Sequence, residues 1–412
     1  MSEVTFPYQT IRDIDVQGKH VLVRADYNVP LNEQGQISDD FRIEASLPTL
    51  KYLLARHAKV VVMSHLGRPK SAADKQFSLA PVARALAAKL DSTITVRFLN
   101  DCIGEEVQQA TAKQTEDEII LLENLRFHKE EKANDPAFAK ALATDTHAEV
   151  FAQDGFGVVH RAHASTASIT EYLPAVAGLL LEREYVAIKQ AVNQPRRPMT
   201  AVIGGAKISD KIPLVKKFIE TADNVIVGGA LANNFLKHLG YNVGASLVED
   251  GVDDIVSDIL QLAHDKYGDA FDEKFILPRD VAIAEHGSLD DPRREVSLTQ
   301  VVDGNVIYDL GEKTINVIDR LVASSGTVIW NGTLGMAERQ QFAHGSARLA
   351  MSLVRDPKIT SVIGGGDTAD FVRNWDSKHG GSFTHVSTGG GASLELMSGQ
   401  TLPGIAALLW RL

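Results

Sequence analysis

Basic side chains in the first half of the chain recur where predicted strands end or predicted helices begin. The set comprises Arg24, Arg42, His65, Arg68, Arg126, Arg161 and His163. Because the carboxyl ends of parallel strands meet at one edge of a sheet, we expect these side chains to form one electropositive patch. Such a patch suits a small anion that carries several charges. The alternative is a set of scattered surface ion pairs.

Glycines take the corresponding places in the second half. Four predicted strands run into glycine turns, at Gly204-Gly205, Gly228-Gly229, Gly364-Gly365-Gly366 and Gly389-Gly390-Gly391. A glycine turn that opens a helix presents free backbone N–H groups and the positive end of the helix dipole to an anion, most often a phosphate. Any one turn could be a tight connection without a ligand. Four of them favour a phosphate site.

Charged residues accompany the glycine turns. Lys207 and Lys211 are four residues apart and share a helix face if the helix begins early enough. Asp367 and Glu338 could hold a magnesium-bound phosphate or a ribose. Positioning and charge stabilisation dominate phosphoryl transfer. The lack of an obvious carboxylate pair or nucleophile triad agrees with direct in-line transfer.

Predicted strands and helices alternate along the chain. Strands are predicted at 20–30, 59–63, 93–96, 119–127, 199–203 and 327–333, and helices at 46–54, 78–90, 179–194 and 209–219. Asp26 and Asn28 share a face of the first strand, although an Asx turn would also explain Asn28. Ser46 and Ser209 are expected to cap their helices, and Arg42 lies just ahead of the first one.

The length and the alternation predict an α/β protein with two Rossmann-like domains. Each is expected to hold a parallel sheet with helices on both faces, because 412 residues exceed one ordinary core. The predicted parts are a first domain at 1–176, a hinge helix at 177–195, a second domain at 196–397 and an apolar C-terminal segment at 398–412. Trp330 and the single cysteine, Cys102, are expected to pack in the core.

Composition restricts the class of protein. The formal net charge of -11 argues against nucleic acid as the main partner. No apolar run approaches the length of a membrane span, and the first residues lack a basic and then apolar signal, so a cytoplasmic location without membrane contact is expected. One cysteine excludes an internal disulfide framework and a multi-cysteine metal site.

Seven motifs in order give the chain its resemblance to a known family. They are Val23-Arg24-Ala25-Asp26-Tyr27-Asn28-Val29-Pro30, Ser64-His65-Leu66-Gly67-Arg68-Pro69-Lys70, Leu122-Glu123-Asn124-Leu125-Arg126-Phe127, His160-Arg161-Ala162-His163-Ala164-Ser165, Gly204-Gly205-Ala206-Lys207, Gly364-Gly365-Gly366-Asp367 and Ser387-Thr388-Gly389-Gly390-Gly391-Ala392. With these motifs the chain resembles phosphoglycerate kinase over almost its whole length.

The resemblance implies reversible phosphoryl transfer from 1,3-bisphosphoglycerate to Mg-ADP, which gives 3-phosphoglycerate and ATP. It implies glycerate binding by Asp26, Asn28, Arg42, His65, Arg68, Arg126 and Arg161, and nucleotide binding by Lys207, Lys211, Glu338, Gly364, Gly365, Gly366, Asp367 and Thr368. Arg42, Lys207, Gly366 and Gly389 would act on the migrating phosphate, and Asp367 would face the Mg²⁺. The resemblance also implies a monomer whose domains close at a hinge, with its C-terminal segment returning to the first domain.

Two stretches depart from the family pattern. The family typically has Asn-Asp-Ala-Phe-Gly at 153–157, where this chain has Gln153 and Gly155, and it has Trp-Asn-Gly-Pro and Val-Phe-Glu where this chain has Thr333, Met336 and Ala337. The adenine side and the hinge packing are expected to differ.

Two other functions would need a different set of residues from a kinase. A non-catalytic nucleotide or polyanion sensor would not need Arg42 and Lys207 together. A dinucleotide-dependent oxidoreductase would carry its glycine fingerprint after the first strand, which here ends in Asp26 and Asn28.

Overall fold

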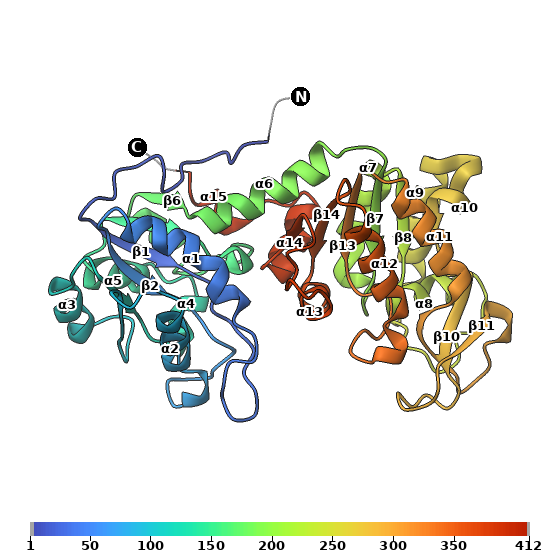
Figure 1. Ribbon diagram of the computed structural model, residues 1–412, viewed down its shortest axis with the longest axis horizontal. Coiled ribbons are helices and arrows are strands. Elements are labelled where there is room, and N and C mark those ends of the chain that lie inside the picture. Colours follow the sequence, from blue (N-terminus) through green and yellow to red (C-terminus); the bar gives the residue numbers. More distant parts are fainter. Residues whose placement is uncertain (1–3, 410–412) are drawn as a thin grey trace. The chain divides into compact units, whose positions relative to one another are not determined.

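The computed structural model describes residues 4–409, which divide into two compact units. Unit 1 consists of the described residues of Met1–Val186 and Thr401–Leu412, and unit 2 is Ala187–Gln400. The division falls inside the helix α6 (Leu179–Asn193). Figure 1 shows the chain with its helices and strands labelled.

A six-stranded parallel sheet forms the centre of unit 1, in the order β3-β4-β2-β1-β5-β6. Its strands are β1 (His20–Arg24), β2 (Lys59–Met63), β3 (Thr95–Phe98), β4 (Glu118–Leu121), β5 (Val150–Gln153) and β6 (Ala175–Ala177). Successive residues of the inner strands are buried on both faces. This explains why the strands read as continuous apolar runs and not as alternating ones.

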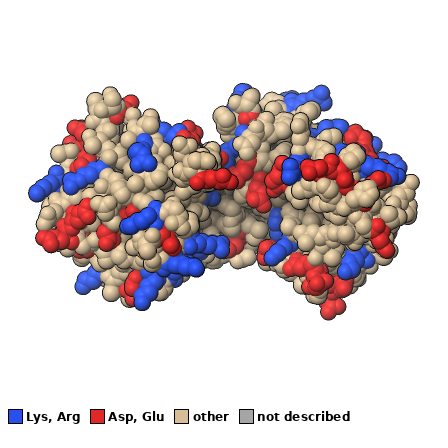
Figure 2. Space-filling view, turned by 90° about the horizontal axis from the view of Figure 1, so that it is seen from below, with Lys and Arg blue, Asp and Glu red and all other residues tan. Residues whose placement is uncertain are grey.

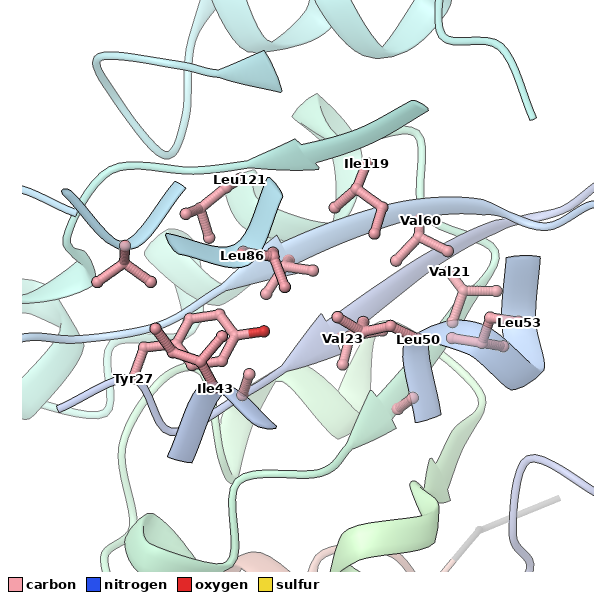
Figure 3. Close-up of a cluster of buried hydrophobic side chains, with 14 of the residues drawn as sticks. Val21, Val23, Tyr27, Ile43, Leu50, Leu53, Val60, Leu86, Ile119 and Leu121 are labelled. Carbon is pink, nitrogen blue, oxygen red and sulfur yellow. The ribbon is translucent and has the colours of Figure 1, made fainter. Parts of the chain in front are cut away.

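Aliphatic side chains from strands and helices fill one face of this sheet (Figure 3). Val21, Val60 and Ile119 of the strands pack with Leu50 of α1 (Phe41–Leu54) and Leu86 of α2 (Ala80–Ala88), and all five are fully buried. Burial of each such side chain contributes roughly 1.5–3 kcal/mol. The strand ends that follow are therefore held by a well-packed core.

The predicted start of the first helix was wrong. The helix α1 begins at Phe41, where the side chain of Asp39 accepts a hydrogen bond from the Phe41 N–H at 2.8 Å. Ser46 therefore lies inside the helix, where its hydroxyl donates to the carbonyl of Ile43 and contacts the Tyr27 hydroxyl. Arg42 belongs to the first turn of the helix.

Short helices complete unit 1. They are α3 (Glu105–Ala112), α4 (Lys129–Lys132), α5 (Pro136–Asp145), α15 (Pro403–Ala406) and the 3-10 turns η1 (Lys75–Phe77), η2 (Leu125–Phe127), η3 (Phe156–Val158) and η4 (Ser168–Glu171). The backbone N–H of Gly404 donates to the carbonyl of Val159 at 2.8 Å. The segment after residue 400 is therefore part of unit 1.

A second six-stranded parallel sheet forms the centre of unit 2, in the order β15-β14-β13-β7-β8-β9. Its strands are β7 (Met199–Ile203), β8 (Asn224–Val227), β9 (Phe275–Ile276), β13 (Thr327–Asn331), β14 (Thr360–Gly364) and β15 (His385–Val386). Trp330 is fully buried in this core, and Cys102 is buried in unit 1, so both packing predictions are confirmed.

Unit 2 also contains an antiparallel sheet that the sequence analysis did not predict. Its order is β11-β10-β12, with β10 (Asp280–Ala284), β11 (Arg294–Ser297) and β12 (Val306–Leu310). The edge strand β11 is mostly exposed and charged. Such a strand lacks the apolar alternation by which strands are recognised in a sequence.

The helices of unit 2 lie between these strands. They are α7 (Ile212–Thr221), α8 (Gly229–His238), α9 (Asp253–Tyr267), α10 (Phe271–Lys274), α11 (Glu312–Ala323), α12 (His344–Arg355), α13 (Gly366–Trp375), α14 (Gly390–Met397) and the 3-10 turns η5 (Ser209–Lys211), η6 (Gly268–Ala270), η7 (Leu298–Gln300) and η8 (Gln340–Phe342). Ser209 does not cap α7, which instead starts with Pro213 in its first turn, a position that proline favours. Within residues 4–409, no helix is long and apolar enough to cross a membrane.

Candidate functional site

The predicted polar residues of unit 1 follow four neighbouring parallel strands. Asp26 and Asn28 follow β1, His65 and Arg68 follow β2, Arg126 lies in η2 after β4, and Arg161 follows η3 after β5. The strand β1 ends at Arg24, so Asp26 and Asn28 lie in the loop beyond it and not on a strand face as predicted. These loops bring the polar side chains to one edge of the sheet.

Arg42 contacts the loop after β1. Its guanidinium donates from NH1 to Oδ2 of Asp26 at 3.2 Å and to the carbonyl of Asn28 at 3.0 Å. The side chain is 27% exposed, so these contacts leave part of it open to solvent. The Asx turn considered for Asn28 is made instead by Asp26, whose Oδ1 accepts from the Asn28 N–H.

Gly67 links two of the predicted residues through its backbone. Its N–H donates to Oδ1 of Asn28 at 2.7 Å, and its carbonyl accepts from NH1 of Arg126 at 2.6 Å. Gly67 has a φ of +61°, and a Cβ here would lie 2.3 Å from the ring of Phe77. Only glycine fits this close, left-handed turn.

Arg126 has buried donors that its surroundings leave free. Its Nε and NH2 groups have no hydrogen-bond partner within residues 4–409. Burial lowers the pKa of Arg126 to about 10, and Arg24 and Arg161 nearby act in the same direction. A cation so placed gains from a bound anion, because the anion satisfies the donors and offsets the charge repulsion.

His65 is buried and neutral among the arginines. Burial lowers the pKa of His65 well below its ordinary value, and Arg24, Arg126, Arg42 and Arg161 lower it further. NH2 of Arg24 lies 3.2 Å from Nδ1 of His65. Because an arginine can only donate, Nδ1 is the acceptor, and Nε2 carries the proton and can donate to a ligand.

Arg68 and Arg161 complete the basic set. Within the described residues, the guanidinium of Arg68 makes no hydrogen bond or ion pair, and Nε of Arg161 donates to Nε2 of His160 at 3.0 Å. Burial, together with Arg161, lowers the pKa of His160 to about 4, so the ring is neutral. Both arginines keep N–H groups for an anion.

Arg24 and His163 also face a carboxylate that the sequence analysis did not select, although Arg24 keeps its contact with His65. Both turn to the buried carboxylate of Glu131, at 3.9 Å from Arg24 NH2 and 3.6 Å from His163 Nδ1. Ser165 donates to the same carboxylate at 2.6 Å. Burial opposes the charge of Glu131, but these partners hold its pKa below the usual value. Glu131 was missed because its surroundings in the sequence are all charged and read as a surface turn.

The glycine turns of unit 2 follow β7, β8, β14 and β15, which are parallel strands of one sheet. Gly364 ends β14, Gly365 has a φ of +89°, and Gly366 opens α13, whose first turn contains Asp367 and Thr368. Gly389 precedes α14, and a Cβ on Gly390 would lie 3.5 Å from the Gly366 nitrogen. The starts of the helices α13 and α14 therefore adjoin each other, and each offers backbone N–H groups to an anion.

Lys211 crosses the base of these turns. Its Nζ donates to the carbonyl of Gly204 at 2.6 Å and to Oδ1 of Asn331 at 2.9 Å. Burial lowers the pKa of Lys211 to about 8, an effect that Asp367 and Asp210 oppose. Lys207 lies in the exposed loop ahead of η5, so the two lysines do not share a helix face.

Asn331 is a further polar group that the sequence analysis did not select. Its Nδ2 is buried without a hydrogen-bond partner within the described residues, and it would lie 3.2 Å from a Cβ on Gly364 and 3.5 Å from one on Gly365. The free amide is thus close to the glycine turn. Its place at the end of β13, the strand between β7 and β14, is the signal that could have found it.

A pocket of about 370 Å³ opens beside these turns, entirely within unit 2. Apolar side chains, with Tyr308 and Met336 among them, line one part of it, and Gly205, Glu338 and Asp367 line another. The hydroxyl of Thr368 accepts from the Gly332 N–H at 2.7 Å, so Thr368 stabilises the turn at Gly332. An apolar slot beside glycine turns and a carboxylate fits a nucleotide.

Charges of both signs share the molecular surface. Figure 2 shows Lys and Arg interspersed with Asp and Glu over one face. The loops of unit 1 and the turns and pocket of unit 2, and not a broad field of one sign, therefore define the candidate sites.

The parallel sheets, the glycine turns and the arginine cluster are those of an α/β kinase that acts on a small phosphorylated anion. The family model of phosphoglycerate kinase matches residues 11–400. The phosphoglycerate kinases of Moorella thermoacetica and Aquifex aeolicus are both 43% identical to the chain, over 399 and 396 residues, which cover 97% and 96% of it and 98% and 96% of those proteins. The solved phosphoglycerate kinase of Coxiella burnetii aligns with a TM-score of 0.82 at 34% identity, covering 98% of this chain and 99% of that one.

The chain belongs to the phosphoglycerate kinase family. The predicted family, the two-sheet α/β fold and the kinase activity are confirmed. The enzyme transfers a phosphate to a carboxyl group. The dinucleotide and sensor alternatives find no support in these comparisons.

Proposed function

We propose that unit 1 binds 3-phosphoglycerate and 1,3-bisphosphoglycerate and that unit 2 binds the adenine nucleotide. The glycerate would be held by Asp26, Asn28, Arg42, His65, Arg68, Arg126 and Arg161. The single observation that carries this assignment is the pair of buried, unpartnered N–H groups on Arg126. Neighbouring arginines and the neutral His65 make this position suitable for an anion with several charges.

The nucleotide would occupy the pocket of unit 2. Its phosphates would meet Lys207, Lys211, Gly364, Gly365, Gly366 and Thr368, and Glu338 would face the sugar. The free Nδ2 of Asn331 supports a phosphate near Gly365. Arg42, Lys207, Gly366 and Gly389 would stabilise the phosphoryl group in flight. Because the substrates belong to different units, direct in-line transfer requires the units to close during turnover.

Magnesium would accompany the nucleotide. Mg²⁺ is commonly held by one or two carboxylates together with substrate phosphates. Asp367 lies in the first turn of α13 and lines the pocket, so its carboxylate fits this requirement. When bound, Mg²⁺ neutralises charge on the phosphates.

The proposal is tested by the initial rate of ATP consumption with 3-phosphoglycerate and Mg²⁺, coupled to reduction of the bisphosphate product. Turnover that is abolished by EDTA supports the reaction and its metal requirement. Calorimetric titration with 3-phosphoglycerate then compares Arg126→Gln with Lys207→Ala. Arg126→Gln should lose most of the affinity, and Lys207→Ala should keep it. Equal losses would contradict the division of the substrates between the units.

We further propose that the enzyme acts as a cytoplasmic monomer. Light scattering of the purified protein tests the oligomeric state, for which the expected mass is that of one 44.7 kDa chain.

A further inference from the structure

The chain's single cysteine lies beside a histidine and an aspartate. A carboxylate oxygen of Asp101, the thiol of Cys102 and a ring nitrogen of His128 all lie within 4.8 Å of one another. Within the described residues, this is the one group of at least three His, Cys, Asp or Glu side chains that could hold a metal ion. We propose that it is a binding site for a thiophilic divalent cation of the Zn²⁺ class.

The sheet brings these residues together. Asp101 and Cys102 follow β3, and His128 follows β4 through η2. The two strands pair in parallel, with Phe98 opposite Leu121, so the loops after them leave the same edge. The backbone N–H of Cys102 donates to Oδ1 of Asp101, which also lies 2.7 Å from Nε2 of His128. The three atoms that could bind a metal ion therefore already lie close together.

The donor set suits zinc better than magnesium. Zinc takes sulfur, nitrogen and oxygen ligands in a tetrahedral arrangement, while a thiolate disfavours Mg²⁺ and Ca²⁺. The ring of His128 stacks on Phe138 at 5.0 Å between centroids, which limits its rotation. With three protein ligands, the fourth position belongs to water.

Two of the three side chains are partly exposed, which gives a cation a route to the buried thiol. Cys102 is only 1% exposed, but the side chains of Asp101 and His128 are 50% and 26% exposed. An ion can thus arrive past the aspartate and the histidine and reach the sulfur from their side.

The charge next to the thiol favours a bound cation. The ligand oxygen of Asp101 lies within 4.8 Å of the sulfur, so a cation between them would offset the repulsion between a thiolate and this carboxylate. The simpler alternative is a histidine–aspartate ion pair beside an inert thiol.

We expect a metal ion bound at this site to affect Arg126. The backbone N–H of His128 donates to the carbonyl of Leu125, in the turn that carries Arg126, and the His128 carbonyl accepts from Glu131. A cation must separate His128 from Asp101 to enter between them, and this movement acts on that turn. This consequence rests on the proposed glycerate site, so Zn²⁺ is expected to weaken 3-phosphoglycerate binding and to leave nucleotide binding unchanged.

The test uses Cd²⁺ as the probe with full-length, metal-free protein. The chain has one cysteine, so the ultraviolet charge-transfer band of a cadmium thiolate reports on Cys102 alone. One Cd²⁺ per chain is expected, and Cys102→Ser should abolish the band. His128→Gln should weaken binding at least about tenfold, since even the outer partners of metal ligands are worth that much.

A matched control uses a histidine that pairs with a carboxylate but has no thiol. His57 lies 3.0 Å from Glu116, so His57→Gln should leave the cadmium titration unchanged. Absence of the band, or the same titration in Cys102→Ser, would overturn the metal site whatever the kinase activity. An unchanged affinity for 3-phosphoglycerate in Zn²⁺-loaded protein would overturn the link to Arg126. The coupled kinase assay without added Zn²⁺ judges the proposed function separately.

Discussion

At the scale of single residues, the guanidinium of Arg126 has buried donors that a bound anion would satisfy. Each buried donor left without a partner costs about 1–3 kcal/mol, and Arg126 has two of them within the described residues. The packed core and the hydrogen bond to Gly67 hold the side chain in place against this cost. An anion that satisfied both donors would recover this cost, and the recovered free energy would add to its affinity.

Arg42→Ala is expected to lower kcat by at least about 10³-fold and to leave ADP affinity nearly unchanged. The reason is that an arginine that stabilises transferring phosphate contributes on this order. Coupled rates and calorimetric titration with ADP measure the two effects.

Arg12→Ala serves as the matched control, because Arg12 is an exposed arginine paired with Glu182. It should keep the wild-type kcat. A parallel loss of kcat and ADP affinity in Arg42→Ala would contradict the role assigned to Arg42.

Nucleotide affinity is expected to fall as the pH rises through about 8. Burial lowers the pKa of Lys211 to about 8 against the opposing effect of Asp367 and Asp210, so the ammonium is charged below that pH and neutral above it. A neutral amine attracts phosphate less. The KM for ADP, measured from pH 6.5 to 9.5, should rise at the alkaline end.

Lys211→Arg is the diagnostic variant, since a guanidinium stays charged over this whole range. Its KM for ADP should be flatter with pH, even if higher overall. Identical pH profiles for the two proteins would exclude Lys211 as the titrating group.

Residue types at strand ends were sufficient to predict most of the candidate site, but not the direction of each side chain. His65 and Arg126 followed from their places after β2 and β4. Arg24 and His163 had the same kind of placement, yet they turn to Glu131. The buried carboxylate that they face belongs to a distant segment of the chain, and no local sequence pattern predicts it.

At the scale of elements, Asp154 fixes the start of α6 to the first sheet. Its Oδ1 accepts from the Thr49 hydroxyl at 2.7 Å and from the Leu180 N–H at 3.0 Å. Because burial outweighs these hydrogen bonds and the nearby Arg183, the pKa of Asp154 is raised to about 7. The connection to α6 thus contains a carboxyl group that titrates near neutrality.

Asp154→Asn should make the stability of unit 1 less dependent on pH. A carboxyl group has a pKa of about 3.9 in an unfolded chain, so its contribution is full below about 4 and is lost as the pH rises through about 7. The loss is at most about 4 kcal/mol. Urea unfolding at pH 5, 6, 7 and 8 should therefore give a steeper decline for the wild type than for Asp154→Asn. Parallel declines would mean that the side chain does not titrate in this window.

Element boundaries were predicted less well than element types. The parallel strands were recognisable because burial on both faces makes them continuously apolar. The helix α1 starts earlier than expected because Asp39, and not Ser46, accepts the hydrogen bond of its first turn. The antiparallel sheet was missed because β11 is charged and exposed.

At the scale of the whole molecule, the segment after Gln400 contributes core residues to unit 1. Leu402 is 2% exposed and Leu409, a few residues on, is 61% exposed. Leu402→Ala should destabilise unit 1 by about 2–5 kcal/mol, and Leu409→Ala should change stability by no more than about 0.5 kcal/mol. Chemical unfolding of each variant gives the change in stability. Repeating it with 3-phosphoglycerate identifies the transition that belongs to unit 1. Equal effects would contradict the packing of this segment.

The same segment determines when unit 1 can complete its folding during synthesis. Ribosomes make a protein from its N-terminus, so residues 187–400 are translated before Thr401 exists. Unit 2 is continuous in sequence and can fold as soon as it emerges, whereas the first 186 residues must wait until Leu402 and Ile405 have left the ribosome. The unit that is translated first is therefore the one that is completed last, and a nascent chain stalled before residue 401 would hold a complete unit 2 together with an incomplete unit 1.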